Sequence, residues 1–201
     1  MQVNSIFIKR KCRRKLPFLW LFLDEDRIFD EATLLKSIPS SKSLGVIVRV
    51  KKKKNLYKKT KKVNKICKAK GFSIFVSSNP QIALSVGADG VHFPRQFKQV
   101  RKYAKLLYSC SFHGLSDLRK TKNLKVEKVF ISPIFKTNSN KKKKPLGLTR
   151  LLFLSRSLRC EVGVLGGINS SNIKKFCGKG ISHLGGVSAF ISKKNLLKYL
   201  C

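Results

Sequence analysis

Acidic side chains are scarce in this sequence. Of its 201 residues, 9 are Asp or Glu and 45 are Lys or Arg, so the formal net charge is +36. Five of the acids stand close together, at Asp24, Glu25, Asp26, Asp30 and Glu31. Few carboxylates therefore remain elsewhere for a metal site or for acid–base catalysis, and we assign no metal ligands from the sequence.

Paired cysteines and long apolar runs are absent as well. The six cysteines include no C-x-x-C pair, and no secretory signal precedes them, so we predict reduced thiols in a cytoplasmic protein. The apolar run at residues 16–23 is too short to span a membrane, so we expect no membrane partner. The sequence leaves the number of copies open, a homo-oligomer included.

The excess of lysine could attract nucleic acid, anionic lipid or phosphorylated metabolites. The lysines are spread over the expected helices and loops, and they form no basic patch interleaved with aromatic residues. We therefore expect only non-specific contact with nucleic acid, and a lysine-biased composition explains the charge equally well. The alternative function that this feature suggests is a non-catalytic barrel whose basic surface binds RNA or an acidic partner.

The pattern of apolar runs predicts the fold. Hydrophobic residues make up 42% of the chain, and from residue 16 onward eight short apolar runs alternate with helical patterns. Such alternation predicts a parallel sheet, which eight repeats can close into a (β/α)₈ TIM barrel. In the alternative, an open doubly wound sheet, glycines would usually follow the first strand, where acids stand here. We assign 1–15 to a basic N-terminal segment and 16–201 to a single barrel domain.

The expected elements follow from these runs and from their glycine and proline boundaries. The first six strands are expected at 16–23, 45–51, 72–76, 90–93, 106–112 and 128–135, and the last two begin at Glu161 and His183. Helices are expected at 31–38, 55–70, 80–86, 97–105 and 116–122, in a segment that ends near Ser157, and at 170–176 and 193–200.

Two glycine pairs mark the last two strands. Gly166 and Gly167 end the seventh apolar run, and Gly185 and Gly186 stand inside the eighth. Glycine lets an anion approach the backbone closely, and barrels commonly bind phosphate at the loops after strands seven and eight. The glycines would also allow tight packing of strand against helix without any ligand. Both interpretations remain open at this point.

Four motifs, in order, resemble the thiamine-phosphate synthases and the related TenI-type thiazole tautomerases. Residues 87–92 read GADGVH, 132–139 resemble GPIFxTxT, 145–147 read PLG, and 165–168 with 187–189 resemble the phosphate-binding strand ends. The resemblance covers nearly all of the chain from Leu16 onward. It implies an enzyme of thiamine biosynthesis that binds a thiazole phosphate. Such an enzyme either condenses the thiazole with a pyrimidine pyrophosphate, as a transferase, or tautomerises it, as an isomerase.

The resemblance also implies substrate-binding residues. Arg49 and Lys51 resemble the pair that contacts the pyrimidine pyrophosphate, although a solvated strand end would look the same in a lysine-rich protein. The hydroxyl residues of the loop after the sixth strand correspond to Thr137 and Ser139. The positions at the phosphate correspond to Gly166, Gly167, Val187 and Ser188.

His113 is the candidate catalytic residue. It ends the fifth expected strand and matches the histidine that serves as acid and base in the tautomerases. A histidine at the carboxyl end of a barrel strand can transfer a proton near neutral pH. The alternative is a polar residue of the barrel rim without a chemical role.

The family resemblance implies Mg²⁺, held by carboxylates after the third and fourth strands. Here the matching segments 77–79 and 94–97 read SSN and PRQF and contain no acid. Because Mg²⁺ is usually bound through one or two carboxylates, its expected ligands are missing. Because Ser78 and Phe97 stand where the carboxylates are expected, we predict no tight Mg²⁺ site. Arg95 could offset the charge of a pyrophosphate directly.

Overall fold

The computed structural model describes residues 16–50, 55–95, 101–137 and 144–191, and its eight parallel strands close into a barrel. Each strand pairs with its neighbours in sequence, and β8 pairs with β1. The predicted (β/α)₈ barrel is therefore confirmed, and the open sheet is excluded. The strands are β1 (Leu19–Leu23), β2 (Leu44–Val48), β3 (Ser73–Ser77), β4 (Gly90–Phe93), β5 (Leu107–Phe112), β6 (Lys128–Ile131), β7 (Glu161–Leu165) and β8 (His183–Gly186).

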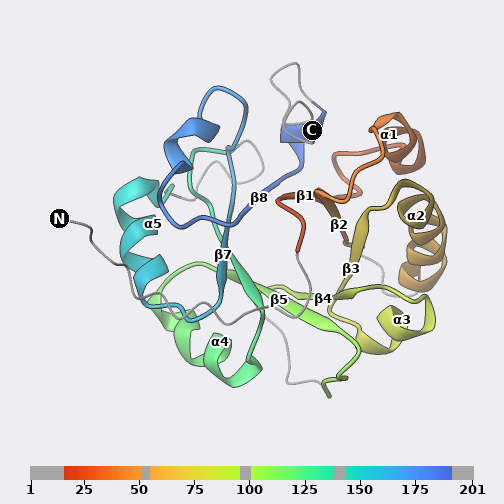
Figure 1. Ribbon diagram of the computed structural model, residues 1–201, viewed down its shortest axis with the longest axis horizontal. Coiled ribbons are helices and arrows are strands. Elements are labelled where there is room, and N and C mark those ends of the chain that lie inside the picture. The colour runs from red at the N-terminus through yellow and green to blue at the C-terminus, as the bar shows by residue number, and fades with distance from the viewer. Residues whose placement is uncertain (1–15, 51–54, 96–100, 138–143, 192–201) are drawn as a thin grey trace.

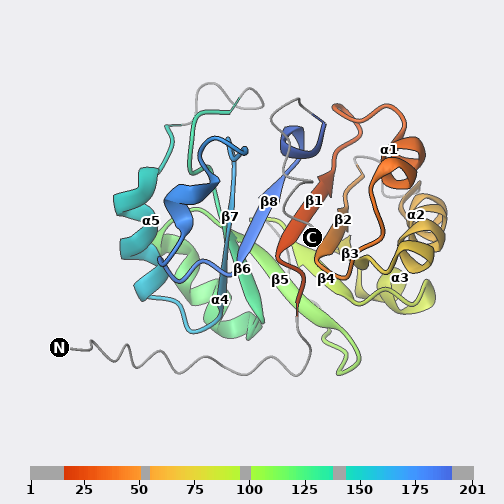
Figure 2. The same ribbon diagram turned by 45° about the horizontal axis from the view of Figure 1, so that its top comes forward.

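Helices surround the barrel, with α1, α2 and α3 on one side and α4 and α5 on the other (Figure 1; Figure 2). Their ends follow local sequence signals: Asp30 accepts a hydrogen bond from Thr33 N at the start of α1, and Gly71 ends α2 at φ +71°. The helices are α1 (Glu31–Ser37), α2 (Leu56–Lys70), α3 (Pro80–Ser85), α4 (Leu118–Leu124) and α5 (Gly147–Arg156), with 3₁₀ helices η2 (Leu115–Asp117), η3 (Ile173–Phe176) and η4 (Ser188–Phe190).

Several expected boundaries are wrong. No helix forms in residues 101–105, the described part of the helix expected at 97–105. There the backbone N–H of Tyr103 donates to the hydroxyl of Tyr108 (2.6 Å), and the chain turns directly into β5. The segment 170–176 contains only the short helix η3, and the helix expected at 193–200 lies outside the described residues.

Several expected strands are shorter than predicted, and the one expected at 45–51 ends at Val48. The strand expected at 128–135 ends at Ile131, because Pro133 has no N–H group for the ladder. The first strand begins at Leu19 rather than at residue 16. The carbonyl of Pro17 instead accepts a hydrogen bond from the indole N–H of Trp20 (2.7 Å).

Large aromatic side chains fill the barrel interior. The Trp20 and Phe75 rings lie 4.9 Å apart between centroids. Each ring occupies the space that a neighbouring side chain would need: a Cβ added at Gly45 would lie 2.5 Å from the Trp20 ring, and one at Gly163 would lie 2.7 Å from Phe130. Because the interior is packed with side chains, a substrate can bind only at the barrel mouth.

Polar side chains also lie inside the amino end of the barrel. Lys128 is fully buried, and its Nζ lies 2.8 Å from the centroid of the Trp20 ring, a cation–π contact. Beside it, His183 Nε2 lies 2.8 Å from a carboxylate oxygen of Glu161. These groups are at the end opposite to the one where barrel enzymes bind substrates, so we assign them to the structure of the barrel.

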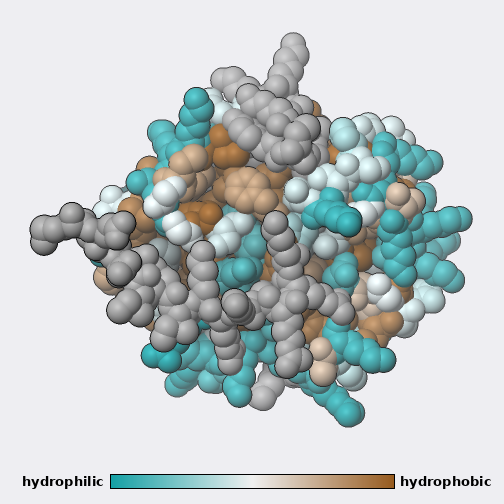
Figure 3. Space-filling view, viewed as in Figure 1, coloured by the Kyte–Doolittle hydropathy of each residue, from teal (hydrophilic) through white to brown (hydrophobic). Residues whose placement is uncertain are grey.

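The surface over α1 and α2 is strongly hydrophilic, as the teal side chains at the right of Figure 3 show. Most lysines of α2 face solvent, whereas Leu56, Val63 and Cys67 are buried against the barrel. The charge thus covers a solvated helix face, as the amphipathic pattern predicts. None of the helices in the described segments combines the length and the hydropathy needed to cross a bilayer.

Candidate functional site

A cavity of about 500 Å³ opens at the carboxyl ends of the strands. Its described lining comes from the segments that follow β1, β2, β6, β7 and β8, the region where barrel enzymes place their active sites. It includes the predicted site residues Arg49, Thr137, Gly166, Gly167, Val187 and Ser188.

Three predicted site residues are not among the described lining of the cavity. Lys51 and Ser139 lie outside the described residues, so their roles remain predictions. His113 follows β5 at the same end of the barrel, but it is not among the residues that line the cavity.

The glycine pair after β7 fits closely against the loop after β6. Gly166 and Gly167 adopt φ values of +99° and +68°, which favour glycine. A Cβ at Gly167 would lie 2.6 Å from the carbonyl oxygen of Lys136, and one at Gly166 would lie 2.9 Å from Pro133. These glycines therefore pack closely against the β6 loop rather than against a helix, and phosphate binding by their backbone remains a prediction.

Hydrogen bonds attach the β6 loop to this glycine turn. Phe135 N donates to the carbonyl of Gly166 (3.0 Å). On the other side, the Asn172 side chain donates to the carbonyl of Gly167 (2.8 Å). The turn is thus fixed from both sides, which positions Lys136 and Thr137 at the cavity wall.

Three cationic side chains line the cavity: Arg27, Arg49 and Lys136. Arg27 is not among the residues predicted from the sequence. It follows the acids after β1, and one of its guanidinium N–H groups donates to the Ser188 hydroxyl (3.1 Å). The signal available in the sequence was a basic residue just beyond a strand's carboxyl end, but only the folded loop brings it to Ser188, 161 residues away.

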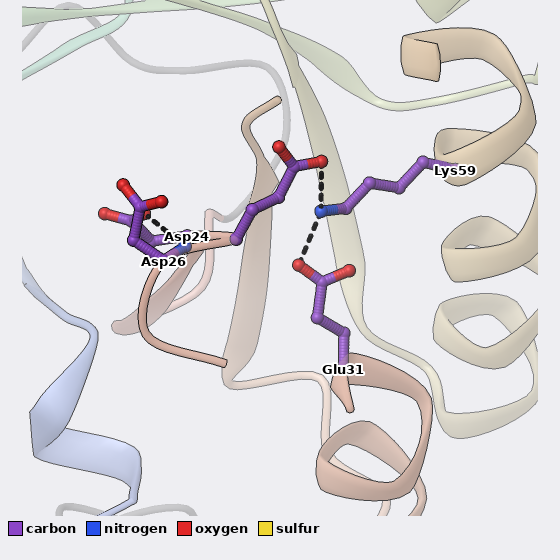
Figure 4. Close-up of polar contacts among 5 residues, drawn as sticks. Asp24, Asp26, Glu31 and Lys59 are labelled. Atoms are coloured by element: carbon purple, nitrogen blue, oxygen red, sulfur yellow. Dashed lines mark hydrogen bonds and ion pairs between the residues drawn. The ribbon is translucent and has the colours of Figure 1, made fainter. Parts of the chain in front are cut away.

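Asp24 is the one carboxylate among the described lining residues. Its neighbour Glu25 and the helix residue Glu31 both bind the ammonium of Lys59, at 3.1 and 2.6 Å. Figure 4 shows Lys59 reaching from α2 toward Glu31, while Asp24 and Asp26 lie together on the far side of the loop. The acidic cluster predicted from the sequence is therefore divided, and only Asp24 faces the cavity.

All nine acidic side chains belong to described residues. Besides Glu25 and Glu31, six acids lie outside the cavity lining: Asp26, Asp30, Asp89, Asp117, Glu127 and Glu161. No group of three or more His, Cys, Asp or Glu within the described residues could hold a metal ion. One carboxylate beside three cations does not fit the donor set that Mg²⁺ requires, so we derive no chemical step through this ion.

His113 connects the carboxyl ends of β5 and β6. Its Nδ1 lies 2.6 Å from the carbonyl oxygen of Ser132, and its backbone N–H donates to Asp117 (2.8 Å). A carbonyl oxygen only accepts hydrogen bonds, so Nδ1 carries the proton and the neutral ring has its basic lone pair on Nε2. Asp117 in turn lies 3.5 Å from the Arg95 guanidinium, so Arg95 forms an ion pair with a carboxylate of the protein.

His92 is buried below the mouth. Its ring nitrogens lie 2.9 Å from the Ser109 hydroxyl and 3.2 Å from that of Ser111. Burial, with smaller contributions from the charges of Arg49 and Lys128, lowers the pKa of His92 from 6.5 to about 3. The ring is therefore neutral at physiological pH, and it packs inside the barrel.

Comparisons with known proteins agree with this arrangement. Residues 24–190 match the family described as thiamine monophosphate synthase. The chain is 29% identical over 188 residues to a putative thiamine-phosphate synthase 2 of Aquifex aeolicus. The matched segment covers 88% of this chain and 99% of the relative. It is 29% identical over 147 residues to a thiamine-phosphate synthase of Prochlorococcus marinus, but spans only 42% of that relative's length and matches over 71% of its own.

Solved structures share the fold. A thiamine phosphate pyrophosphorylase from Pyrococcus furiosus superimposes with a TM-score of 0.75 at 19% identity and covers 90% of both chains. A second one, from Bacteroides thetaiotaomicron, gives a TM-score of 0.55 at 18% identity over 86% of this chain and 83% of the other. At these identities the likeness concerns the barrel and not its chemistry.

Proposed function

Because this chain belongs to the thiamine monophosphate synthase family, we propose that it binds a thiazole phosphate in the cavity and condenses it with a pyrimidine pyrophosphate. Relatives named as thiamine-phosphate synthases, which are transferases, agree with the prediction of an enzyme. The comparisons give no support to the alternative of an RNA-binding barrel. The observation that carries the proposal is the cavity, which combines the glycine turn after β7 with three cationic side chains.

The thiazole phosphate would bind between the ends of β7 and β8. There the segment of Gly167 approaches that of Ser188, and the Arg27 guanidinium already reaches the Ser188 hydroxyl. Backbone N–H groups and a guanidinium are suitable donors for phosphate oxygens. In this arrangement the phosphate fixes the thiazole so that its ring points toward the barrel axis.

The pyrimidine pyrophosphate would bind beside the thiazole, between the ends of β2 and β6. Arg49 follows β2, and Lys136 extends from the β6 loop into the same cavity. Pyrophosphate leaves during the condensation, and cations placed near a leaving group stabilise the negative charge that develops on it. Holding both substrates in one cavity makes the reaction effectively unimolecular.

One observation favours a second candidate function, tautomerisation of a thiazole phosphate. The hydrogen bond from His113 to the Ser132 carbonyl fixes the tautomer that carries its basic lone pair on Nε2. Such a ring can take a proton from one position of a substrate and return it to another. This chemistry uses the same phosphate site and needs no second substrate.

The two functions can be separated by assay. We would first measure binding of the thiazole phosphate by calorimetry, and then follow thiamine phosphate formation from both substrates by chromatography. We expect saturable binding of the thiazole phosphate and product formation that depends on Arg49, with a large loss in Arg49→Gln. Conversion of the thiazole phosphate tautomer in the absence of the pyrimidine would identify the isomerase instead. Absence of thiazole phosphate binding would contradict both functions.

A further inference from the structure

We infer that the phosphate groups of the substrates are held at this mouth by Arg27, Arg49 and Lys136, without a divalent cation. This inference rests on the proposed function and concerns how the same cavity neutralises its ligands. Three cations and one carboxylate line it, so the described part of the site is already positive before any metal binds. A divalent cation would be repelled by the same charges that attract phosphate.

The other carboxylates near the mouth already bind protein groups. Glu25 and Glu31 share the Lys59 ammonium, and Asp117 binds the His113 backbone and Arg95. Turning Glu25 or Glu31 toward the cavity would remove a partner from Lys59. Turning Asp117 would remove a partner from Arg95 and from the His113 N–H. Either change is unfavourable. Of Asp24 and Asp26, which lie together in the loop after β1 (Figure 4), only Asp24 lines the cavity, and one carboxylate gives Mg²⁺ little of the oxygen coordination that it requires.

Arg27 is held in place by its own loop. The backbone N–H groups of Arg27 and Ile28 both donate to the carbonyl of Asp24 at 3.0 Å, and the Ile28 side chain is buried. The loop therefore turns back at a fixed point, and the guanidinium extends to Ser188 at 3.1 Å. A phosphate at Ser188 would meet a planar group with several N–H donors, a geometry that allows paired hydrogen bonds.

Arg49 and Lys136 supply charge at the ends of β2 and β6. Arg49 directly follows Val48, which is fully buried at the end of β2, so its backbone is anchored while its side chain remains exposed. Lys136 is exposed too, and its carbonyl packs against Gly167. Rigid backbones with mobile charged ends suit phosphate groups that differ in position between two substrates.

The direct test is calorimetric titration of the full chain with inorganic pyrophosphate, once with EDTA and once with excess Mg²⁺. We expect binding in EDTA, and Mg²⁺ should not strengthen it by more than about twofold, because no carboxylate set links the two ligands. Binding of pyrophosphate that requires Mg²⁺, or is strengthened about tenfold or more by it, would overturn the inference.

Variants identify the cations. Arg27→Gln and Arg49→Gln should each weaken pyrophosphate binding in EDTA by about tenfold, since each removes a charge-assisted hydrogen bond. Arg27→Lys should fall between Arg27→Gln and the unmodified chain, because it keeps the charge and loses the planar donors. Arg156→Gln is the matched control: it removes the same charge from the exposed end of α5, away from the cavity, and should bind normally.

The outcomes separate the inference from the proposed function. Thermal unfolding of each variant establishes that it folds, so that weak binding reflects the lost contact. Equal loss in Arg156→Gln and Arg27→Gln would mean that net charge alone attracts pyrophosphate, which contradicts a site built from named cations. A thiazole phosphate that binds only with Mg²⁺ would overturn the inference and leave the proposed function intact. Failure of the thiazole phosphate to bind under either condition would overturn the proposed function itself.

Discussion

The two halves of the barrel mouth differ in composition and in what they enclose. The ends of β1, β2, β6, β7 and β8 line the cavity with glycines and with Arg27, Arg49 and Lys136. The ends of β3, β4 and β5 contribute no residue to the described lining, and their polar groups bind one another: Arg95 pairs with Asp117, and Asp117 accepts from the His113 backbone.

This difference coincides with how closely each half resembles the family. The half with the glycine turns contains the motifs that resemble phosphate-binding strand ends. The other half has serines after β3 and Arg95 after β4, at the positions where the family resemblance implies Mg²⁺ carboxylates. From this difference we expect a cavity that has donors for phosphate and lacks ligands for a metal.

The largest expected effect belongs to His113, the residue of the β3–β5 half with a proposed chemical role. His113→Asn should lower the turnover of a thiazole phosphate tautomer by about 10²–10⁴-fold, because a general acid–base group is lost. Binding of the thiazole phosphate should change little, because the proposed phosphate site lies at the ends of β7 and β8 and does not include His113. Full turnover in this variant would remove the tautomerase candidate, and loss of affinity with loss of rate would indicate a positioning role.

Gly167→Val should produce the next largest effect, in the cavity half. The new side chain would collide with the Lys136 carbonyl and force an unfavourable φ, at a cost of about 1–3 kcal/mol for the backbone conformation alone. We expect a lower melting temperature together with weakened phosphate binding, measured by calorimetry. Normal stability and normal affinity would show that the turn neither packs nor binds as described.

Asp117→Asn tests the β3–β5 half directly. Asp117 is buried, and the change removes the charge that faces Arg95 and weakens the contact with the His113 N–H. We expect a loss of about 1–3 kcal/mol in the free energy of unfolding. Inorganic phosphate affinity should stay the same, because the contact lies outside the cavity. A large fall in affinity at unchanged stability would contradict the division of the mouth.

The smallest expected effect is a pH dependence of stability. His92 has its pKa lowered to about 3 by burial, and burial also lowers the pKa of His183. Below pH 6.5 the unfolded chain takes up protons on these histidines more readily than the folded chain does, so stability falls as the pH decreases. His92 alone should contribute a slope of about 1 kcal/mol per pH unit.

Urea unfolding between pH 7 and pH 5 measures that slope. In His92→Gln one histidine no longer contributes, so the slope should become shallower. An unchanged slope would mean that His92 is already protonated in the folded protein. It would also contradict the contribution of the Arg49 charge to the lowered His92 pKa.

Much of the fold could be predicted from the sequence, because alternating apolar runs and glycine boundaries are local signals. The barrel and the order of its strands followed from them, whereas the family resemblance implied the site residues Arg49 and Ser188, which line the cavity. The helix expected at 97–105 was wrong because its described part is shaped by a contact between Tyr103 and Tyr108 that no periodicity reveals.

The least predictable part of the site is the contact between distant segments. Arg27 reaches Ser188 only after β1 and β8 pair, and a sequence gives no direct sign of that proximity. The division of the acidic cluster is similar: Glu25 turns to Lys59 on α2, whereas Asp24 lines the cavity. Local patterns predict the elements, and side-chain partners depend on how those elements meet.

The most direct test of the central claim is a crystal structure of the protein with a thiazole phosphate bound, grown in EDTA. We predict the phosphate between the ends of β7 and β8, within hydrogen-bonding distance of Arg27 and Ser188, with no metal density beside it. A phosphate bound against Arg95 and His113 in the β3–β5 half would contradict the claim.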